Sequence, residues 1–156
     1  WQGAGAAVQA ACVRMQSDVK GLGAQAHAIE PTEAHAHWQA VREQTLVFFT
    51  APAADACLWR LSVPQIAPVL SLPFAQCVEW QGGLRWLWAP ATEALRLRQV
   101  AAHAGGHATL FRHAQDGSSH AVPTFTPLSD VQRRLQQALQ MQFDPHAVFK
   151  TERIGI

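Results

Sequence analysis

Along residues 57–63 every second side chain is apolar, and three prolines follow this segment at short intervals. One side of the alternation carries Cys57, Trp59, Leu61 and Val63; the other carries Leu58, Arg60 and Ser62. A period of two residues is typical of a β-strand that buries one face. Pro64, Pro68 and Pro73 exclude a long helix directly after it, because proline lacks the backbone N–H and clashes with the preceding turn. The chain must therefore leave this strand through an irregular segment.

A hairpin is predicted next, with strands at 74–80 and 84–88 around Gln81-Gly82-Gly83. A two-residue turn at Gly82-Gly83 would place Trp80 beside Arg85. A three-residue turn gives each strand one apolar face, and it sets Glu79 opposite Arg85. The residues on that apolar face would be Phe74, Gln76, Val78, Trp80, Leu84, Trp86 and Trp88. Since a one-residue slip reverses every side chain, we favour the three-residue turn, with core tryptophans and a Glu79–Arg85 ion pair.

The remaining segments alternate between helical and extended patterns. Apolar side chains recur every three or four residues in four predicted helices, at 8–22, 31–45, 90–104 and 128–142, the last capped by Ser129 or Thr126. Short strands are predicted at 24–29 and 107–112, and 46–49 is a tail or a short strand. Helices interleaved with a tight hairpin favour an α+β fold. We expect a ferredoxin-like, mixed or antiparallel sheet with helices packed on one face.

Composition excludes several classes of protein. The formal net charge is +1, and no Lys/Arg stripe suggests nucleic acid or an anionic membrane as partner. No apolar run reaches the ~18 residues of a membrane span. The three cysteines match no zinc spacing, so we interpret them as buried thiols in a reducing compartment. His35 and His37 point apart on a helix, and no metal site is predicted.

Six segments together resemble one protein family. They are WQAVREQ (38–44), LWRLSVP (58–64), EWQGGLRWL (79–87), AGGHATLFR (104–112), FTPL (125–128) and FDPHAVF (143–149). In this order and spacing they resemble the C-terminal part of the E subunit of bacterial glycolate oxidase, an FAD-linked oxidase of the vanillyl-alcohol-oxidase type. The resemblance covers residues 36–153. The family's tail motif Phe-Asn-Pro-Gly-Arg survives here only as Phe149 and Arg153, and its metal-binding His-x-x-Gly-Asp-Gly-Asn-x-His element has no counterpart.

The resemblance implies a role and a set of partners. Residues 1–156 would form a single C-terminal cap domain over the reactive end of FAD, with the flavin bound mainly by an N-terminal domain absent from this chain. Trp1-Gln2-Gly3 looks like the end of a strand, which agrees with an incomplete protein. The parent protein would oxidise glycolate to glyoxylate beside a D-type flavin subunit and an iron–sulfur subunit. We expect a cytoplasmic protein, which its partners could hold at the inner face of the membrane.

Oxidation of a 2-hydroxy acid by a flavin needs a cation for the carboxylate and a base for the hydroxyl proton. Arginine suits the first role because its planar fork binds carboxylates bidentately. Arg60 and Arg85 are the candidates to face substrate or flavin from the sheet face without helices, and the alternative is that both are solvated or paired with Glu79. Arg153 is a third candidate, through the tail motif. His107, after Gly105-Gly106, is the candidate base, and a strand-edge histidine bound to backbone is the alternative.

No glycine-rich phosphate loop occurs in the sequence, so the isolated chain is expected to be inactive and to bind FAD weakly or not at all. Whether the parent is an enzyme rests on the resemblance alone. The alternative is a non-catalytic ferredoxin-like domain, which would serve binding or subunit structure. The sequence leaves open which 2-hydroxy acid is used and whether the E-type flavin reacts or relays electrons.

Overall fold

The computed structural model describes residues 4–146 and 148, and it divides into two compact units at residues 46 and 47. The first unit holds α1 (Gly5–Gly21) and α2 (Pro31–Arg42), which confirms both predicted helices. Residues 24–29 were expected to form a strand, but they lie in neither strand nor helix. An extended segment becomes a strand only where a neighbour accepts its backbone hydrogen bonds, so this prediction was wrong. The predicted strand end at residues 1–3 lies outside the described residues.

The second unit is built on a four-stranded sheet in the order β2-β3-β1-β4. Its strands are β1 (Ala56–Ser62), β2 (Gln76–Glu79), β3 (Leu84–Pro90) and β4 (His107–Arg112). Every neighbouring pair is antiparallel. Before the sheet, the apolar segment expected as a tail or short strand forms a single 3₁₀ turn, η1 (Val47–Phe49).

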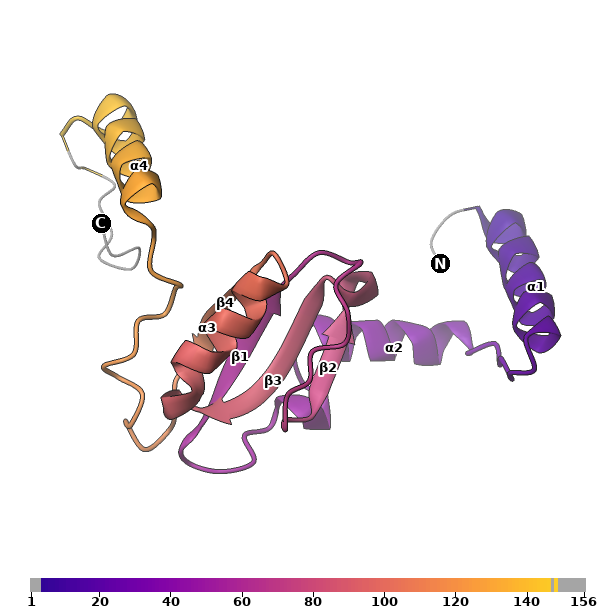
Figure 1. The fold of residues 1–156 in the computed structure, drawn as a ribbon. Coiled ribbons are helices and arrows are strands. Elements are labelled where there is room, and N and C mark those ends of the chain that lie inside the picture. Colours follow the sequence, from indigo (N-terminus) through magenta and orange to yellow (C-terminus); the bar gives the residue numbers. More distant parts are fainter. Residues whose placement is uncertain (1–3, 147, 149–156) are drawn as a thin grey trace. The chain divides into compact units, whose positions relative to one another are not determined.

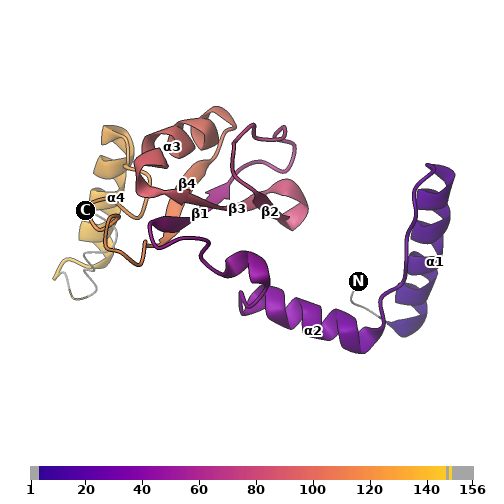
Figure 2. The same cartoon turned by 90° about the horizontal axis from the view of Figure 1, so that it is seen from below.

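One face of the sheet is covered by α3 (Ala94–His103), which follows the short turn η3 (Ala91–Glu93) (Figures 1 and 2). Trp59 and Leu61 of β1 are fully buried against this helix, together with Leu97 and Ala101 from α3 itself. Burial of each leucine contributes about 1.5–3 kcal/mol. The layer between α3 and the sheet is the hydrophobic core of the second unit. The indole of Trp59 also donates from Nε1 to the carbonyl of Ala89 at 3.2 Å.

The chain returns from α3 to the sheet through a very close approach at Gly106. Its backbone N–H donates to the carbonyl of Ala101 at 2.8 Å. A Cβ atom at this position would lie 1.9 Å from the carbonyl oxygen of Ser62, so no larger residue fits. This contact sets the start of β4 against the end of β1 and brings His107 opposite Ser62.

The connection from β1 to β2 contains no helix, as the three prolines predict. Leu70 is buried in the core from this connection, and Leu72 and Phe74 pack against it. Arg85 fixes the backbone of the same segment: its Nη1 and Nη2 donate to the carbonyls of Pro68 and Ala67 at 2.8 and 3.0 Å. Its Nε donates to the carbonyl of Gly82 at 3.2 Å. The guanidinium therefore joins the crossover to the β2–β3 turn.

The hairpin exists, but its predicted register was wrong. The β2–β3 connection uses four residues, 80–83, and pairs Glu79 with Leu84 and Val78 with Arg85. Trp80 and Gln81 both adopt positive φ angles, 50° and 55°, which lengthens the turn beyond the three residues expected. As a result Glu79 and Arg85 lie on opposite faces, and the ion pair between them does not form. Trp80 is 77% exposed and is not a core residue, whereas Trp86 is buried.

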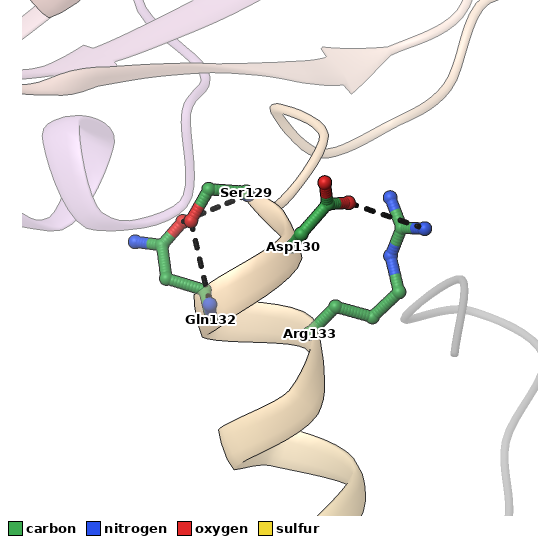
Figure 3. Close-up of polar contacts among 4 residues, drawn as sticks. All are labelled: Ser129, Asp130, Gln132 and Arg133. Atoms are coloured by element: carbon green, nitrogen blue, oxygen red, sulfur yellow. Dashed lines mark hydrogen bonds and ion pairs between the residues drawn. The ribbon is translucent and has the colours of Figure 1, made fainter.

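Beyond the sheet, residues 124–126 run along the free edge of β4. The carbonyl of Thr124 accepts from Leu110 N, and the Thr126 hydroxyl donates to the carbonyl of Ala108, both at 2.8 Å. The last helix, α4 (Asp130–Phe143), begins at Ser129 with the predicted cap. Figure 3 shows that cap: Ser129 Oγ accepts from Gln132 N, and the Gln132 side chain accepts from Ser129 N. Such a reciprocal box satisfies two otherwise unpaired donors.

The predicted α+β class is confirmed, and the sheet is antiparallel throughout. A ferredoxin-like motif has helices in two crossovers. Among the described residues only the β3–β4 crossover contains one, so the finer name stays a prediction. The division into two units also leaves the single-domain prediction for 1–156 open.

Replacing Arg85 by methionine should destabilise the second unit by about 2–3 kcal/mol, because three partly buried hydrogen bonds to backbone carbonyls lose their charged donor. Urea unfolding followed by tryptophan fluorescence measures this. Arg96→Met is the matched control, since the Arg96 side chain is half exposed and, among the described residues, forms an ion pair with Glu93 at 3.3 Å. It should cost less than about 0.5 kcal/mol. Equal losses in the two variants would contradict the role given to Arg85.

Candidate functional site: the outer face of the sheet

The sheet face opposite α3, here called the outer face, carries the polar side chains of the candidate site. Residues directly opposite in antiparallel strands share a face, so the registers define its members. They are Leu58, Arg60 and Ser62 of β1, Cys77 and Glu79 of β2, Leu84, Trp86 and Trp88 of β3, and His107, Thr109 and Phe111 of β4. Arg60 thus lies away from the helix, as the sequence predicts.

Four of these side chains form a polar quartet on two adjacent strands: Arg60, Ser62, His107 and Thr109. Arg60 is opposite Thr109, and Ser62 is opposite His107. Opposite Cβ atoms in such pairs are about 5 Å apart and diagonal ones about 7–8 Å. The structure therefore brings the predicted cation, Arg60, and the predicted base, His107, to diagonal corners of one small patch.

Arg60 is exposed, and its guanidinium lies over the indole of Trp86 with Cζ 6.0 Å from the ring centroid. No acidic side chain in residues 4–146 or at 148 forms an ion pair with it. Its neighbours across the strands, Trp86 and Thr109, are uncharged. Arg60 therefore presents its guanidinium beside an aromatic wall, an arrangement that favours a planar anion such as a carboxylate.

Trp86 is the buried centre of the outer face and was not recognised as a site residue from sequence. Only 5% of it is exposed, and its ring meets Phe49 and Phe111 edge to face at 5.7 and 4.9 Å. Its Nε1 donates to Glu79 Oε2 at 2.6 Å. Ser62 and Thr109 were missed as well. Only the β1–β4 register identifies those two, because they lie 47 positions apart in the chain.

The other predicted site arginines are placed elsewhere. Arg85 is 5% exposed and lies on the α3 side of the sheet, where backbone carbonyls occupy its three nitrogen atoms. It does not meet Arg60, because successive residues of β3 point to opposite faces. We therefore leave Arg85 out of the proposed site. Arg153 and the segment Lys150-Thr151-Glu152, where the chain differs from the family's tail motif, lie outside the described residues.

Cys77 shares the outer face with Glu79 and lies opposite Trp86. Burial, and then the nearby Glu79 carboxylate, raise the pKa of the Cys77 thiol above its usual range. A raised pKa reduces the thiolate fraction at neutral pH, and the thiolate is the reactive species. Cys77 is thus a poor nucleophile. All three cysteines are free, and Cys57 alone of them is fully buried.

A hollow lies within the first unit, between α1, residues 26–31 and α2. Its volume is about 920 Å³, and no Lys, Arg, Asp or Glu lines it. Apolar side chains line it from both helices, among them Val8, Met15 and Trp38, and Ile29 adds to the wall from the connection between them. None of the predicted site residues belongs to it.

Two kinds of site receive no support from the described part of the chain. Within it, no group of three His, Cys, Asp or Glu side chains is close enough to hold a metal ion, and no helix is long and apolar enough to cross a membrane. Ser119, in the loop after β4, is fully buried, with its Oγ accepting from Ala114 N at 2.9 Å and lying 3.0 Å from His113 Nδ1. This serine orders its own loop and is closed to substrate.

Taken together, these features define an α+β protein with an exposed, aromatic-backed arginine patch on one sheet face. Comparison with known proteins adds a named relative: the glycolate oxidase subunit GlcE of Escherichia coli (strain K12) is 44% identical over 117 residues. That segment is 75% of this chain and 30% of the relative's length. The resemblance to the E subunit of glycolate oxidase is thereby confirmed. No family model matches the chain, and no solved structure matches it.

Cys77 should react slowly with iodoacetamide at pH 8.5, because its pKa is raised. Replacing Glu79 by glutamine removes the neighbouring charge and should speed the alkylation about two- to five-fold, since lowering a pKa increases the thiolate fraction. Peptide mass spectrometry gives the rate at each cysteine, and Cys12 serves as internal control. An unchanged Cys77 rate in the variant would show that Glu79 does not act on the thiol.

Proposed function

We propose that this chain is the substrate-side cap domain of an FAD-dependent 2-hydroxy-acid oxidase subunit of the glycolate oxidase type. The observation that carries the proposal is Arg60, an exposed arginine on the outer face that forms no ion pair with any described residue, in a chain that resembles a glycolate oxidase subunit. The chain spans only 30% of that relative, so oxidation of glycolate to glyoxylate is proposed here for the assembled protein.

In this proposal the polar quartet binds the substrate. Arg60 holds the carboxylate, because a guanidinium fork matches the two carboxylate oxygens. His107, diagonal to Arg60, accepts the proton of the 2-hydroxyl group. The hydroxyls of Ser62 and Thr109 stand at the other two corners and can donate to the same oxygens. A small 2-hydroxy acid, with its carboxylate and hydroxyl on neighbouring carbons, fits this spacing.

The described residues suit the reactive end of a flavin better than its phosphates. Phosphates are bound by glycine-rich loops that lead into helix N-termini. The glycine pairs here, 82–83 and 105–106, lead into strands instead. FAD, which supplies hydride acceptance when bound, would therefore be held mainly by a separate domain. This chain would contribute the carboxylate cation and the proton acceptor.

The same proposal names partners. A D-type flavin subunit and an iron–sulfur subunit would carry the electrons onward, in a cytoplasmic complex held at the inner face of the membrane. The relative's designation as a subunit supports an assembly of several chains. The large exposed side chains of α1 and α2, among them Val13 and Trp38, are suited to contacts with further protein.

The isolated 156-residue chain should bind FAD more weakly than micromolar and show no oxidase activity, because it offers no phosphate-binding loop. Flavin fluorescence titration and a glycolate-dependent dye-reduction assay measure both properties. A submicromolar dissociation constant, or turnover with added FAD alone, would contradict the division of labour proposed here.

In the assembled oxidase, Arg60→Ala should lower kcat/KM for glycolate at least about 10-fold, because the carboxylate loses its charged partner. Steady-state kinetics over a range of glycolate concentrations checks this. Arg96→Ala, on the α3 side of the sheet, is the matched control and should leave the kinetics unchanged. Unchanged kinetics in Arg60→Ala would remove Arg60 from the site and favour the alternative of a non-catalytic binding or structural domain.

A further inference from the structure

We propose that Trp86 is the positioning residue of the carboxylate site and that Glu79 anchors it. Trp86 would hold the Arg60 guanidinium on the outer face through its ring, while Glu79 fixes the indole from the far side. This inference rests on the proposed function for its ligand, a small carboxylate. The contacts themselves stand independently of that ligand.

The indole of Trp86 is held on every side that the structure describes. Phe49 meets it at an interplanar angle of 84° and Phe111 at 80°, so two aromatic edges fix the plane of the ring. The 2.6 Å hydrogen bond from Nε1 to Glu79 Oε2 fixes its rotation within that plane. Charge-assisted hydrogen bonds of this length are the strong ones. The ring is thus a firmly held platform on the outer face, beside the exposed side chains of Arg60 and His107.

Arg60 uses that platform. Its Cζ lies 6.0 Å from the ring centroid, at the outer limit of the range in which the negative face of an indole attracts a cation. A guanidinium held through its flat face keeps its N–H edges available for a ligand. An exposed arginine without such a platform would lose far more side-chain entropy on binding a carboxylate. Trp86 reduces that cost in advance.

Glu79 acts through the indole and not directly. It belongs to β2 and Arg60 to β1, with β3 between them, so the two backbones are about 10 Å apart. In the pairing register Glu79 is aligned with Ser62 across the strands. Arg60 and Trp86 are aligned with each other two residues further along the same face. A carboxylate that accepts a hydrogen bond from the indole N–H enriches the ring in electrons and strengthens its attraction for the guanidinium. The acid is therefore placed to support Arg60 without competing for its N–H groups.

The test uses the full 156-residue chain, labelled with ¹⁵N and ¹³C, and sodium glycolate as the probe. Two signals are followed: the ring-current shift of the Arg60 Hδ and Hε protons, and the glycolate dissociation constant. Trp86→Phe keeps a ring but loses the N–H, and Trp86→Leu removes the ring. Trp88→Phe is the matched control, because Trp88 lies two residues along the same face of β3 and donates to the Phe48 carbonyl instead.

The upfield shift of Arg60 should decrease in the order wild type, Trp86→Phe, Trp86→Leu, and glycolate affinity should fall about two- to five-fold in the same order. Trp88→Phe should change neither signal. If Trp86→Leu does not fold, the Arg60 shift and the glycolate affinity of Trp86→Phe are compared with those of Trp88→Phe, and this comparison tests the positioning role. An Arg60 shift that is the same in wild type and Trp86→Phe, or an equal change in Trp88→Phe, would overturn the positioning role.

The outcome for Trp86 can be separated from that for the proposed function. If wild-type chain shows the Trp86-dependent Arg60 shift but no saturable glycolate binding up to molar concentration, the ligand assignment fails and the platform stands. If glycolate binds with equal affinity to wild type and to both Trp86 variants, the positioning role fails and the carboxylate site stands.

Discussion

The arrangement of the sheet depends on a single buried guanidinium. Arg85 binds three backbone carbonyls, two in the crossover after β1 and one in the β2–β3 turn, and so holds in place a connection that contains no helix. Because Arg85 must face the α3 side to reach those carbonyls, its neighbour Trp86 must face the other way. Because successive strand residues point to opposite faces, Trp86 lies on the outer face. There it is opposite Arg60, and its indole donates to Glu79 of β2. The structural arginine thus sets the position of the exposed one.

The sequence predicts the parts of this fold that have local causes. Alternation identifies β1, the prolines exclude a helix after it, and Ser129 caps α4, all from neighbouring residues. The register of the hairpin could not be predicted in this way. Two non-glycine residues, Trp80 and Gln81, take the left-handed conformation where glycines were available, and the extra turn residue reverses one strand's faces. Their conformation depends on distant contacts, among them Gln65 Nε2 donating to the Trp80 carbonyl at 3.3 Å.

The candidate site divides in the same manner. Arg60 and His107 were identified from residue type, and their predicted strands exist, but only the β1–β4 pairing shows that they share a patch with Ser62 and Thr109. Arg85 was assigned to the same face as Arg60 because the tryptophans of both strands were expected on the helix-covered face, whereas the β1–β3 register places Trp86 opposite Arg60. Trp86 was predicted to be a core residue, and it is buried. Its ring also contacts the Arg60 guanidinium, so this buried residue belongs to the candidate binding site as well. An aromatic residue can thus serve packing and ligand recognition together.

The central claim is that the outer face is the substrate side of a glycolate-oxidase-type protein. The most direct measurement is a crystal structure of the assembled oxidase with glycolate bound. The account predicts a carboxylate oxygen about 3 Å from an Arg60 nitrogen atom, with the ligand hydroxyl turned toward His107. Glycolate bound away from this chain, or on the α3 side of its sheet, would contradict the account.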